Sequence, residues 1–133
     1  MKKIILSLLI YLTFSHLHSQ EIKLIKIFEG LNKPWSLSFI DENNILVTEK
    51  PGNILIVNLK NKSKSVISHN LSVLEDGQGG LLDVLYNDGN VYVSYSENRG
   101  NWQSSTSVAR GKFNNENIKF KNIFRAEPPI KSG

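Results

Sequence analysis

The stretch Asn44-Ile45-Leu46-Val47-Thr48-Glu49 recurs 46 residues later as Asn90-Val91-Tyr92-Val93-Ser94-Tyr95. Asn matches Asn, Ile matches Val, Val matches Val and Thr matches Ser. At the same offset Trp35-Ser36-Leu37-Ser38-Phe39 aligns with Leu81-Leu82-Asp83-Val84-Leu85. The first two predicted strands of one repeat therefore align with the first two of the other. A period in the low-to-middle forties with four strands per unit is the signature of β-propeller blades.

Short β-like runs rich in Ile, Val, Leu, Tyr and Phe follow one another from Glu21 onward, separated by clusters of Asn, Asp, Gly, Pro and Lys. Several runs alternate with period two, as half-buried strands do, and none shows sustained helical periodicity. The pattern therefore predicts an all-β fold. The predicted strands are 22–28, 35–40, 45–49, 54–59, 64–68, 81–86, 91–96, 105–113 and 118–124.

These strands group into two four-stranded blades and a leading strand. Blade one covers 34–68, blade two covers 80–124, and strand 22–28 is left over to complete the last blade of a closed ring. Propellers carry about 4 to 8 blades, and two alone would leave large apolar faces uncovered. We expect a partial chain of a longer propeller, with 124–133 in an inter-blade loop. A self-contained two-sheet sandwich of eight or nine strands is the alternative.

The first twenty residues have the layout of a secretory signal peptide: two lysines, an apolar run over 4–14 and a polar exit over 15–20. The apolar run is eleven residues long, whereas a membrane-spanning helix needs about 20. We expect cleavage after Ser19, no membrane anchor in the product, and a periplasmic or secreted location. Residues 20–133 would form the exported part.

The charge and cysteine content narrow the function classes. Loss of two lysines with the signal peptide lowers the formal charge from +4 to +2. No block of Lys or Arg accompanies this small surplus, which gives little support for a nucleic-acid partner. The chain has no cysteine, so the exported product is expected to hold together by packing without disulfides.

Three groups of residues carry a family resemblance. They are Leu31 to Phe39 with Leu46 to Gly52; Gly77-Gln78-Gly79-Gly80-Leu81-Leu82-Asp83-Val84, the most distinctive; and Val91 to Glu97 with Thr106 to Gly111 and Ile123 to Ala126. In order and spacing these groups resemble the soluble aldose sugar dehydrogenases that depend on pyrroloquinoline quinone (PQQ), also described as glucose/sorbosone dehydrogenases.

The resemblance implies a six-bladed propeller that binds PQQ and calcium in a central depression. It implies oxidation of the anomeric hydroxyl of an aldose sugar to a lactone, with reduced PQQ passing its electrons to an acceptor. A histidine then acts as general base, since imidazole titrates near neutral pH. That histidine belongs to a His-Phe-Gly-Ser-Arg-like motif expected just beyond Gly133, with the calcium ligands and quinone-binding residues later still. We therefore expect no catalytic residue or metal ligand here, and no activity from this chain alone.

Gln78 is the one residue that the resemblance places in the pocket for substrate and cofactor. Its amide donates and accepts hydrogen bonds at once, which suits a sugar hydroxyl. From the local sequence alone, Gly77-Gln78-Gly79-Gly80 is a turn whose glycines supply positive φ. Both interpretations hold if a tight loop presents the side chain.

Other candidates have simpler explanations. His16 and His18 leave with the signal peptide, and His69 is interpreted as a solvated loop residue. Arg110 is interpreted as a surface charge at a strand end, and Trp102 either lies exposed or stacks on a sugar face. Pairs such as Glu75-Asp76 and Asp88-Gly89 lack the pattern of a calcium loop, and Asp88-Gly89 predicts a hairpin turn.

The sequence alone leaves two other functions open. An exported propeller can serve as a binding or interaction module without catalysis, because fold does not dictate chemistry. A calcium-dependent lactonase on a similar propeller would need early acidic ligands, which cannot be placed here. The sequence after Gly133 would discriminate among them.

Overall fold

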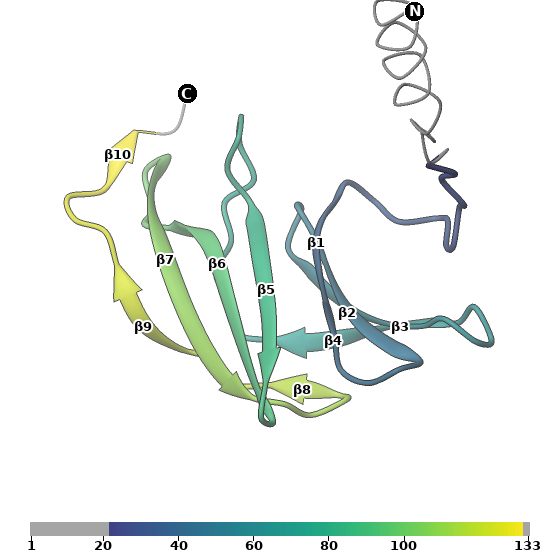
Figure 1. The fold of residues 1–133 in the computed structure, drawn as a ribbon. Helices are drawn as coiled ribbons and strands as arrows, with labels where there is room; N and C mark the ends of the chain where they lie inside the picture. Colours follow the sequence, from purple (N-terminus) through teal and green to yellow (C-terminus); the bar gives the residue numbers. More distant parts are fainter. Residues whose placement is uncertain (1–21, 132–133) are drawn as a thin grey trace, which may run out of the picture.

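The computed structural model describes residues 22–131, and this part of the chain contains ten strands and no helix. Sheet 1 has the order β1 (Pro34–Phe39), β2 (Asn44–Glu49), β3 (Asn53–Asn58), β4 (Lys64–His69) and β8 (Asn117–Ile118). Sheet 2 has the order β10 (Ile130–Lys131), β7 (Gln103–Lys112), β6 (Asn90–Asn98) and β5 (Leu81–Asn87), with β9 (Lys121–Arg125) also paired to β7. The two sheets stand side by side (Figure 1). The all-β prediction is confirmed.

Tight turns join β1 to β4, and β5 to β7, into antiparallel meanders. Between β5 and β6, Asp88 and Gly89 have φ values of 47° and 71°, as a two-residue hairpin turn requires, so the predicted turn is confirmed. Between β1 and β2, the Asp41 carboxylate accepts hydrogen bonds from the backbone N–H groups of Asn43 (2.8 Å) and Asn44 (2.9 Å). The side-chain amide of Asn44 and these backbone donors lower the pKa of Asp41.

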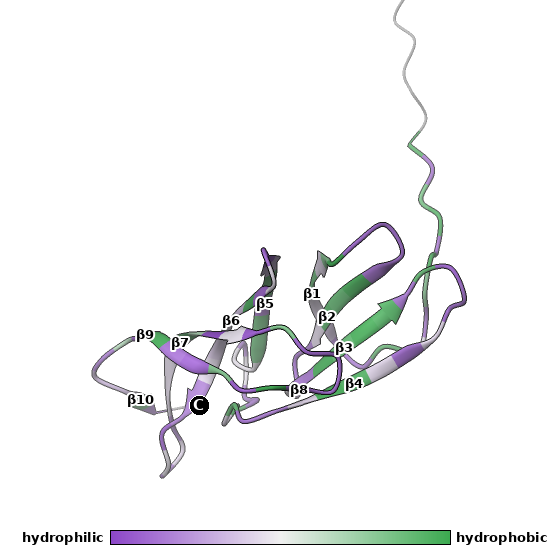
Figure 2. Cartoon of the chain, turned by 90° about the horizontal axis from the view of Figure 1, so that it is seen from below, coloured by the Kyte–Doolittle hydropathy of each residue, from purple (hydrophilic) through white to green (hydrophobic). Residues whose placement is uncertain are grey.

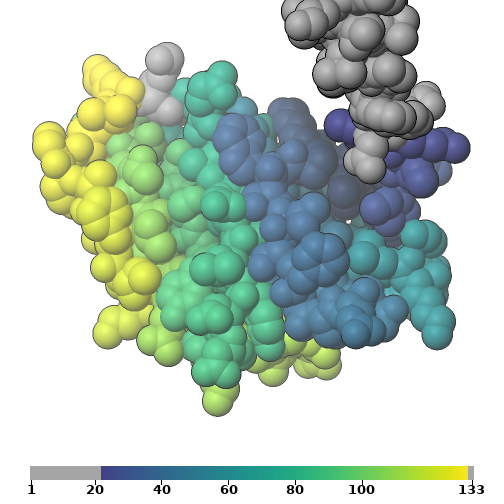
Figure 3. Space-filling model, viewed as in Figure 1, coloured from purple at the N-terminus to yellow at the C-terminus, as the bar shows by residue number. Residues whose placement is uncertain are grey.

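The main core lies between the two sheets. Alternating residues of β2, β3 and β4 face those of β5, β6 and β7, and side chains of β8 and the following residues close one end. The buried residues are Leu46, Ile54, Ile67, Leu81, Val84, Val91, Val93, Tyr95, Ala109, Ile118 and Phe120. Strand β3 is among the most continuously hydrophobic segments (Figure 2), and the sheets form one unbroken surface in Figure 3. Burial of each large aliphatic side chain contributes about 1.5–3 kcal/mol.

Polar contacts fix the seam between β1 and β5, the strands at which the sheets meet. The backbone N–H of Tyr86 donates to Ser38 Oγ at 2.9 Å, and the Ser36 hydroxyl donates to the Asp83 carboxylate. The N–H of Leu81, at the start of β5, donates to the carbonyl of Lys50 at 2.9 Å. Sheet 2 is therefore held in a defined position against sheet 1.

The prediction of a leading strand over 22–28 is wrong for the described part of the chain. Residues 22–31 take no strand conformation, because no neighbouring strand among residues 22–131 supplies the ladder hydrogen bonds that define one. Instead, Phe28 and Leu31 pack on the outer face of sheet 1, the face that carries Ile45, Val47, Leu55 and Val57 and points away from sheet 2.

The predicted strand over 118–124 is also wrong, because it is two strands in different sheets. Strand β8 runs parallel to β4, and β9 runs antiparallel to β7. Between them the N–H of Phe120 donates to the side-chain oxygen of Asn70 at 2.8 Å, so a side chain replaces the strand partner. The segment 124–133, predicted as a loop, contains β10, in which Ile130 and Lys131 pair with β7.

Candidate functional site

The loop before β5 is a tight turn that presents Gln78. The N–H of Gly79 donates to the Asp76 carbonyl at 2.6 Å, which closes the turn, and Gly77 has a φ of 49°. Gly80 has a φ of +151°, and a Cβ there would lie 2.5 Å from the Lys50 carbonyl oxygen. Only glycine fits such a position. The turn interpretation is thus confirmed, and the Gln78 side chain is exposed.

Gln78 lies on the edge of an open depression of about 370 Å³, a size within the usual range of ligand sites. The Gln78 depression is lined by Asp76, Gly77, Gln78, Gly79, Ser96, Ser104, Ser105, Thr106, Ile130 and Lys131. Five of these ten residues carry a hydroxyl or a side-chain amide, and both kinds of group donate and accept hydrogen bonds. Lys131 is the one cation lining it. The donor set suits a polyhydroxylated ligand.

A polar cluster fixes the strand beside this depression. Glu97 Oε2 accepts hydrogen bonds from Ser107 (2.6 Å), Asn122 (3.0 Å) and Arg125 Nε (2.7 Å). Tyr95 donates to the Asn122 side-chain oxygen at 2.8 Å. We call these five residues the Glu97 cluster. It ties β9 to β6 and β7.

Charge and burial set the protonation of this cluster. The Glu97 side chain is only 12% exposed, yet its pKa is lowered, chiefly by the hydrogen bond from Arg125 and also by Ser107. Burial raises the pKa of Tyr95. Glu97 is therefore ionised and Tyr95 neutral at pH 7, which is the pairing that their hydrogen bonds require.

Arg99 makes a second set of contacts, between the Glu97 cluster and the depression. Arg99 donates to Glu127 at 2.9 Å and to Ser105 Oγ at 3.0 Å. Because Glu127 lies between β9 and β10, this contact fixes the segment that leads to Ile130 and Lys131. The Glu97 cluster and Arg99 together therefore position the chain that leads from β9 to the β10 side of the Gln78 depression.

His69 is not the solvated loop residue that was predicted. It ends β4 and is half-buried. Its Nε2 lies 2.8 Å from the Gly52 carbonyl oxygen, and the N–H of Leu71 donates to its Nδ1 at 3.2 Å. Both ring nitrogens are therefore used within the fold, so we assign His69 a structural role.

Arg110 and Trp102 lie at opposite ends of β7. Arg110 donates to the Asn90 side-chain oxygen at 2.9 Å and lies over the Tyr92 ring. It is six residues from Ser104 along the strand, or roughly 20 Å, which places it away from the Gln78 depression and agrees with a surface charge. Trp102 lies at the tip of the β6–β7 hairpin and is exposed.

No three acidic or histidine side chains within residues 22–131 come together as a metal site. Glu75, one of the acidic residues considered for calcium, pairs instead with Lys33 at 2.7 Å. The Gln78 depression has a single cation, too few for a cofactor with several carboxylates. The residues that line the Gln78 depression therefore do not make a binding set for calcium or for PQQ.

The comparisons with known proteins agree with the sheet arrangement. Residues 31–133 match the Glucose / Sorbosone dehydrogenase family. The chain belongs to the glucose/sorbosone dehydrogenase family. It is 29% identical over 114 residues to the Escherichia coli aldose sugar dehydrogenase YliI, covering 79% of this chain and 31% of that protein. A solved glucose dehydrogenase superposes with a TM-score of 0.75 at 32% identity, covering 82% of this chain and 34% of that structure.

A third relative is similar in fold. The structure of the PQQ-bound form of an aldose sugar dehydrogenase from Streptomyces coelicolor has a TM-score of 0.68 at 24% identity, covering 79% of this chain and 34% of that one. The chain thus spans about a third of the length of these relatives. Residues 22–131 include no helix of the length and hydrophobicity needed to cross a membrane. The predicted signal peptide, with His16 and His18, lies outside the described residues.

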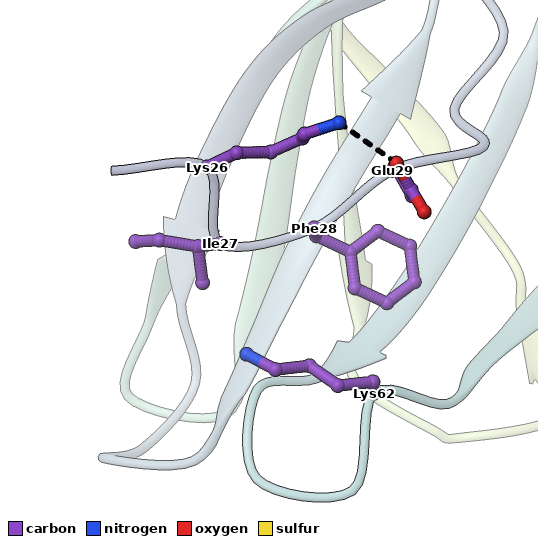
Figure 4. Close-up of a pocket in the computed structure, with 5 residues that line it drawn as sticks. All are labelled: Lys26, Ile27, Phe28, Glu29 and Lys62. Atoms are coloured by element: carbon purple, nitrogen blue, oxygen red, sulfur yellow. Dashed lines mark hydrogen bonds and ion pairs between the residues drawn. The ribbon is translucent and has the colours of Figure 1, made fainter. Parts of the chain in front are cut away.

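Another hollow, of about 460 Å³, lies between the segment before β1 and the β3–β4 turn. It is lined by Lys26, Ile27, Phe28, Glu29 and Lys62 (Figure 4). Its charges consist of Lys62 and an exposed ion pair between Lys26 and Glu29 at 2.9 Å, a type of pair that contributes at most about 1 kcal/mol. None of these five residues suggests a catalytic or ligand-binding role.

The sequence predicted Gln78 but missed the other walls of the depression and the Glu97 cluster. Ser105 and Ser107 alternate with outward residues on a predicted strand, and polar residues at inward positions are a signal for a buried network. The β10 wall left no such signal, because a two-residue strand has no periodicity.

Proposed function

We propose that this chain forms the first two blades of an exported six-bladed propeller that oxidises aldose sugars with PQQ. Two observations support the ring. The sheets repeat the same four-stranded meander side by side, and solved glucose dehydrogenases superpose on both. The observation that carries the function is the Gln78 depression, whose polar lining suits a sugar.

The exposed apolar residues on the outer face of sheet 1 are evidence that this chain is part of a larger propeller. Leu37 and Phe39 are 55% and 60% exposed, and they line an apolar hollow of about 390 Å³ together with Trp35. Solvated surfaces seldom carry such a face. In a closed propeller the last blade would cover it, and the exposed apolar residues of 22–27 would join that blade as its outer strand.

In the proposed reaction, the anomeric hydroxyl of the aldose is oxidised to a lactone. PQQ, held by residues outside the described part of the chain, would supply a quinone as hydride acceptor, and an electron acceptor would take up its electrons. The Gln78 amide binds and orients a sugar hydroxyl, and the hydroxyls of Ser96, Ser104 and Thr106 line the same depression. We place the general base and the calcium ligands outside the described residues, so the chain alone would be inactive.

The test uses the full-length product of the gene. The protein is purified after export, loaded with PQQ and calcium, and assayed for dye reduction with several aldoses. We expect aldose-dependent reduction that requires PQQ. Folded, PQQ-loaded protein that reduces no dye with any aldose would exclude the oxidoreductase and favour a binding module.

The role of Gln78 is tested in the same assay. Loss of one neutral hydrogen bond corresponds to about 1 kcal/mol, so Gln78→Ala should raise the KM for the aldose by about fivefold, with Ser65→Ala on distant β4 as the matched control. An unchanged KM in Gln78→Ala would remove Gln78 from the pocket.

A further inference from the structure

Trp102 is held in an unusual backbone conformation at the tip of the β6–β7 hairpin. Gly100, Asn101 and Trp102 have φ values of 78°, 50° and 57°. Glycine is the residue that such turn positions favour, and a bulky side chain in the left-handed region is strained. The ring is nevertheless 74% exposed. Packing therefore does not explain why tryptophan occupies this position.

The turn is rigid. The N–H of Gln103 donates to the Gly100 carbonyl at 2.9 Å, and the N–H of Arg99 donates to the Gln103 carbonyl at 2.9 Å. The Asn98 side-chain oxygen accepts from the Gly100 N–H at 2.9 Å. The indole is thus presented on a fixed support, which lowers the entropy cost of binding a ligand.

Trp102 adjoins the Gln78 depression. It precedes Ser104, which lines the depression, by two residues. Its own hollow, of about 430 Å³, is lined by Leu74, Asn98, Gly100, Asn101 and Trp102. The N–H of Leu74 donates to the carbonyl of Ser96 at 2.9 Å, and Ser96 lines the depression. Asn98 of this hollow also pairs with Ser104 of the depression across the β6–β7 hairpin, so the two hollows are neighbours.

The chemistry of this second hollow suits a carbohydrate. An aromatic face packs against the C–H groups of a pyranose ring, and the amides of Asn98 and Asn101 can donate to and accept from its hydroxyls. Leu74 is the one aliphatic side chain in the lining, whereas a protein-docking core would present a broader apolar surface.

We propose that Trp102, with Asn98 and Asn101, forms a second sugar subsite. It takes the ring next to the oxidised one when the substrate is a disaccharide or a longer aldose oligosaccharide. The reducing-end ring lies in the Gln78 depression, so this inference rests on the proposed function for that ring. Trp102 is then a specificity residue, and it takes no part in the oxidation itself.

The test compares glucose with maltose and cellobiose in the full-length, PQQ-loaded protein. Trp102→Ala should raise the KM for a disaccharide about tenfold and leave that for glucose within twofold, and Trp102→Phe should recover most of the loss. The matched control is Val66→Ala, an exposed residue of β4, which should change neither KM. Equal effects on glucose and disaccharides, or no effect on either, would overturn the subsite.

A binding measurement separates this inference from the oxidation. Calorimetric titration with methyl maltoside and methyl cellobioside, which have no free anomeric hydroxyl, needs no turnover. The wild type should bind one of them about tenfold more tightly than Trp102→Ala does, even if no aldose is oxidised. Wild-type protein that binds neither glycoside, or binds them as Trp102→Ala does, would refute the subsite while leaving an observed glucose oxidation intact.

Discussion

Replacement of Glu97 by alanine should release β9 from sheet 2. The substitution leaves the buried Ser107 hydroxyl without its acceptor, at about 1–3 kcal/mol. It also removes one hydrogen bond from the half-buried Asn122 amide, at about 0.5–1.5 kcal/mol. Arg125 loses its partner too, but its side chain is 43% exposed and water can replace the carboxylate, so that loss is small. Together these effects amount to about 3 kcal/mol.

The assay is hydrogen exchange of the β9 amides in the full-length protein, read by mass spectrometry. Local opening of a strand governs this exchange, and 1.4 kcal/mol corresponds to a factor of ten. Glu97→Ala should therefore exchange β9 amides about 100-fold faster than the wild type at pH 7. Glu116→Gln, an exposed carboxylate, serves as the control and should change the rate less than threefold.

The effect depends on pH in a defined direction. The pKa of Glu97 is lowered in the folded protein, so the ionised form stabilises the fold. That stabilisation is complete above the unfolded pKa of about 4.5 and is lost as the pH falls through the folded pKa. The gap in exchange rate between wild type and Glu97→Ala should therefore shrink below pH 4.5. Exchange in Glu97→Ala within threefold of wild type at pH 7 would refute the anchoring role.

Three further substitutions have expected outcomes in the full-length protein. Ile54→Ala empties a fully buried position and should lower the free energy of unfolding by about 2–5 kcal/mol, measured by urea titration; a loss below 1 kcal/mol would contradict the core assignment. Gly111→Ala places a Cβ 2.4 Å from Ile118 Cγ2, and overpacking of this kind costs about 1–3 kcal/mol, which should appear as a lower thermal midpoint. Gly80→Ala collides with the Lys50 carbonyl oxygen and should raise the KM for the aldose more than Gln78→Ala does; an unchanged KM would show that the loop does not position the site.

The sequence contained enough information to predict the two sheets. The segment Asn44 to Glu49 and its copy Asn90 to Tyr95 are short, and each predicts a strand from its own residues. Each copy is the second strand of a four-stranded meander. The Asp88-Gly89 turn was predictable for the same reason, since its geometry depends on two adjacent residues.

What could not be predicted depends on partners distant in sequence. The break between β8 and β9 arises because Asn70 hydrogen-bonds the backbone of Phe120, fifty residues away. The segment 22–28 has strand-like composition, but a strand also needs a neighbour. At the site, the family resemblance pointed to Gln78 and the local sequence predicted only its glycine-rich turn, whereas the pairing of Ile130 and Lys131 with β7 has no local signature.

The ring arrangement is tested most directly by the thermal unfolding midpoint of Leu37→Asp in the full-length protein, with Ser65→Asp as the control. Leu37 is 55% exposed in residues 22–131, so a self-contained two-sheet fold should tolerate the change within about 0.5 kcal/mol. If a further blade covers this face, a buried unpaired charge should destabilise the protein by several kcal/mol, and the midpoint should fall by well over 5 °C. A midpoint equal to that of Ser65→Asp would contradict the propeller.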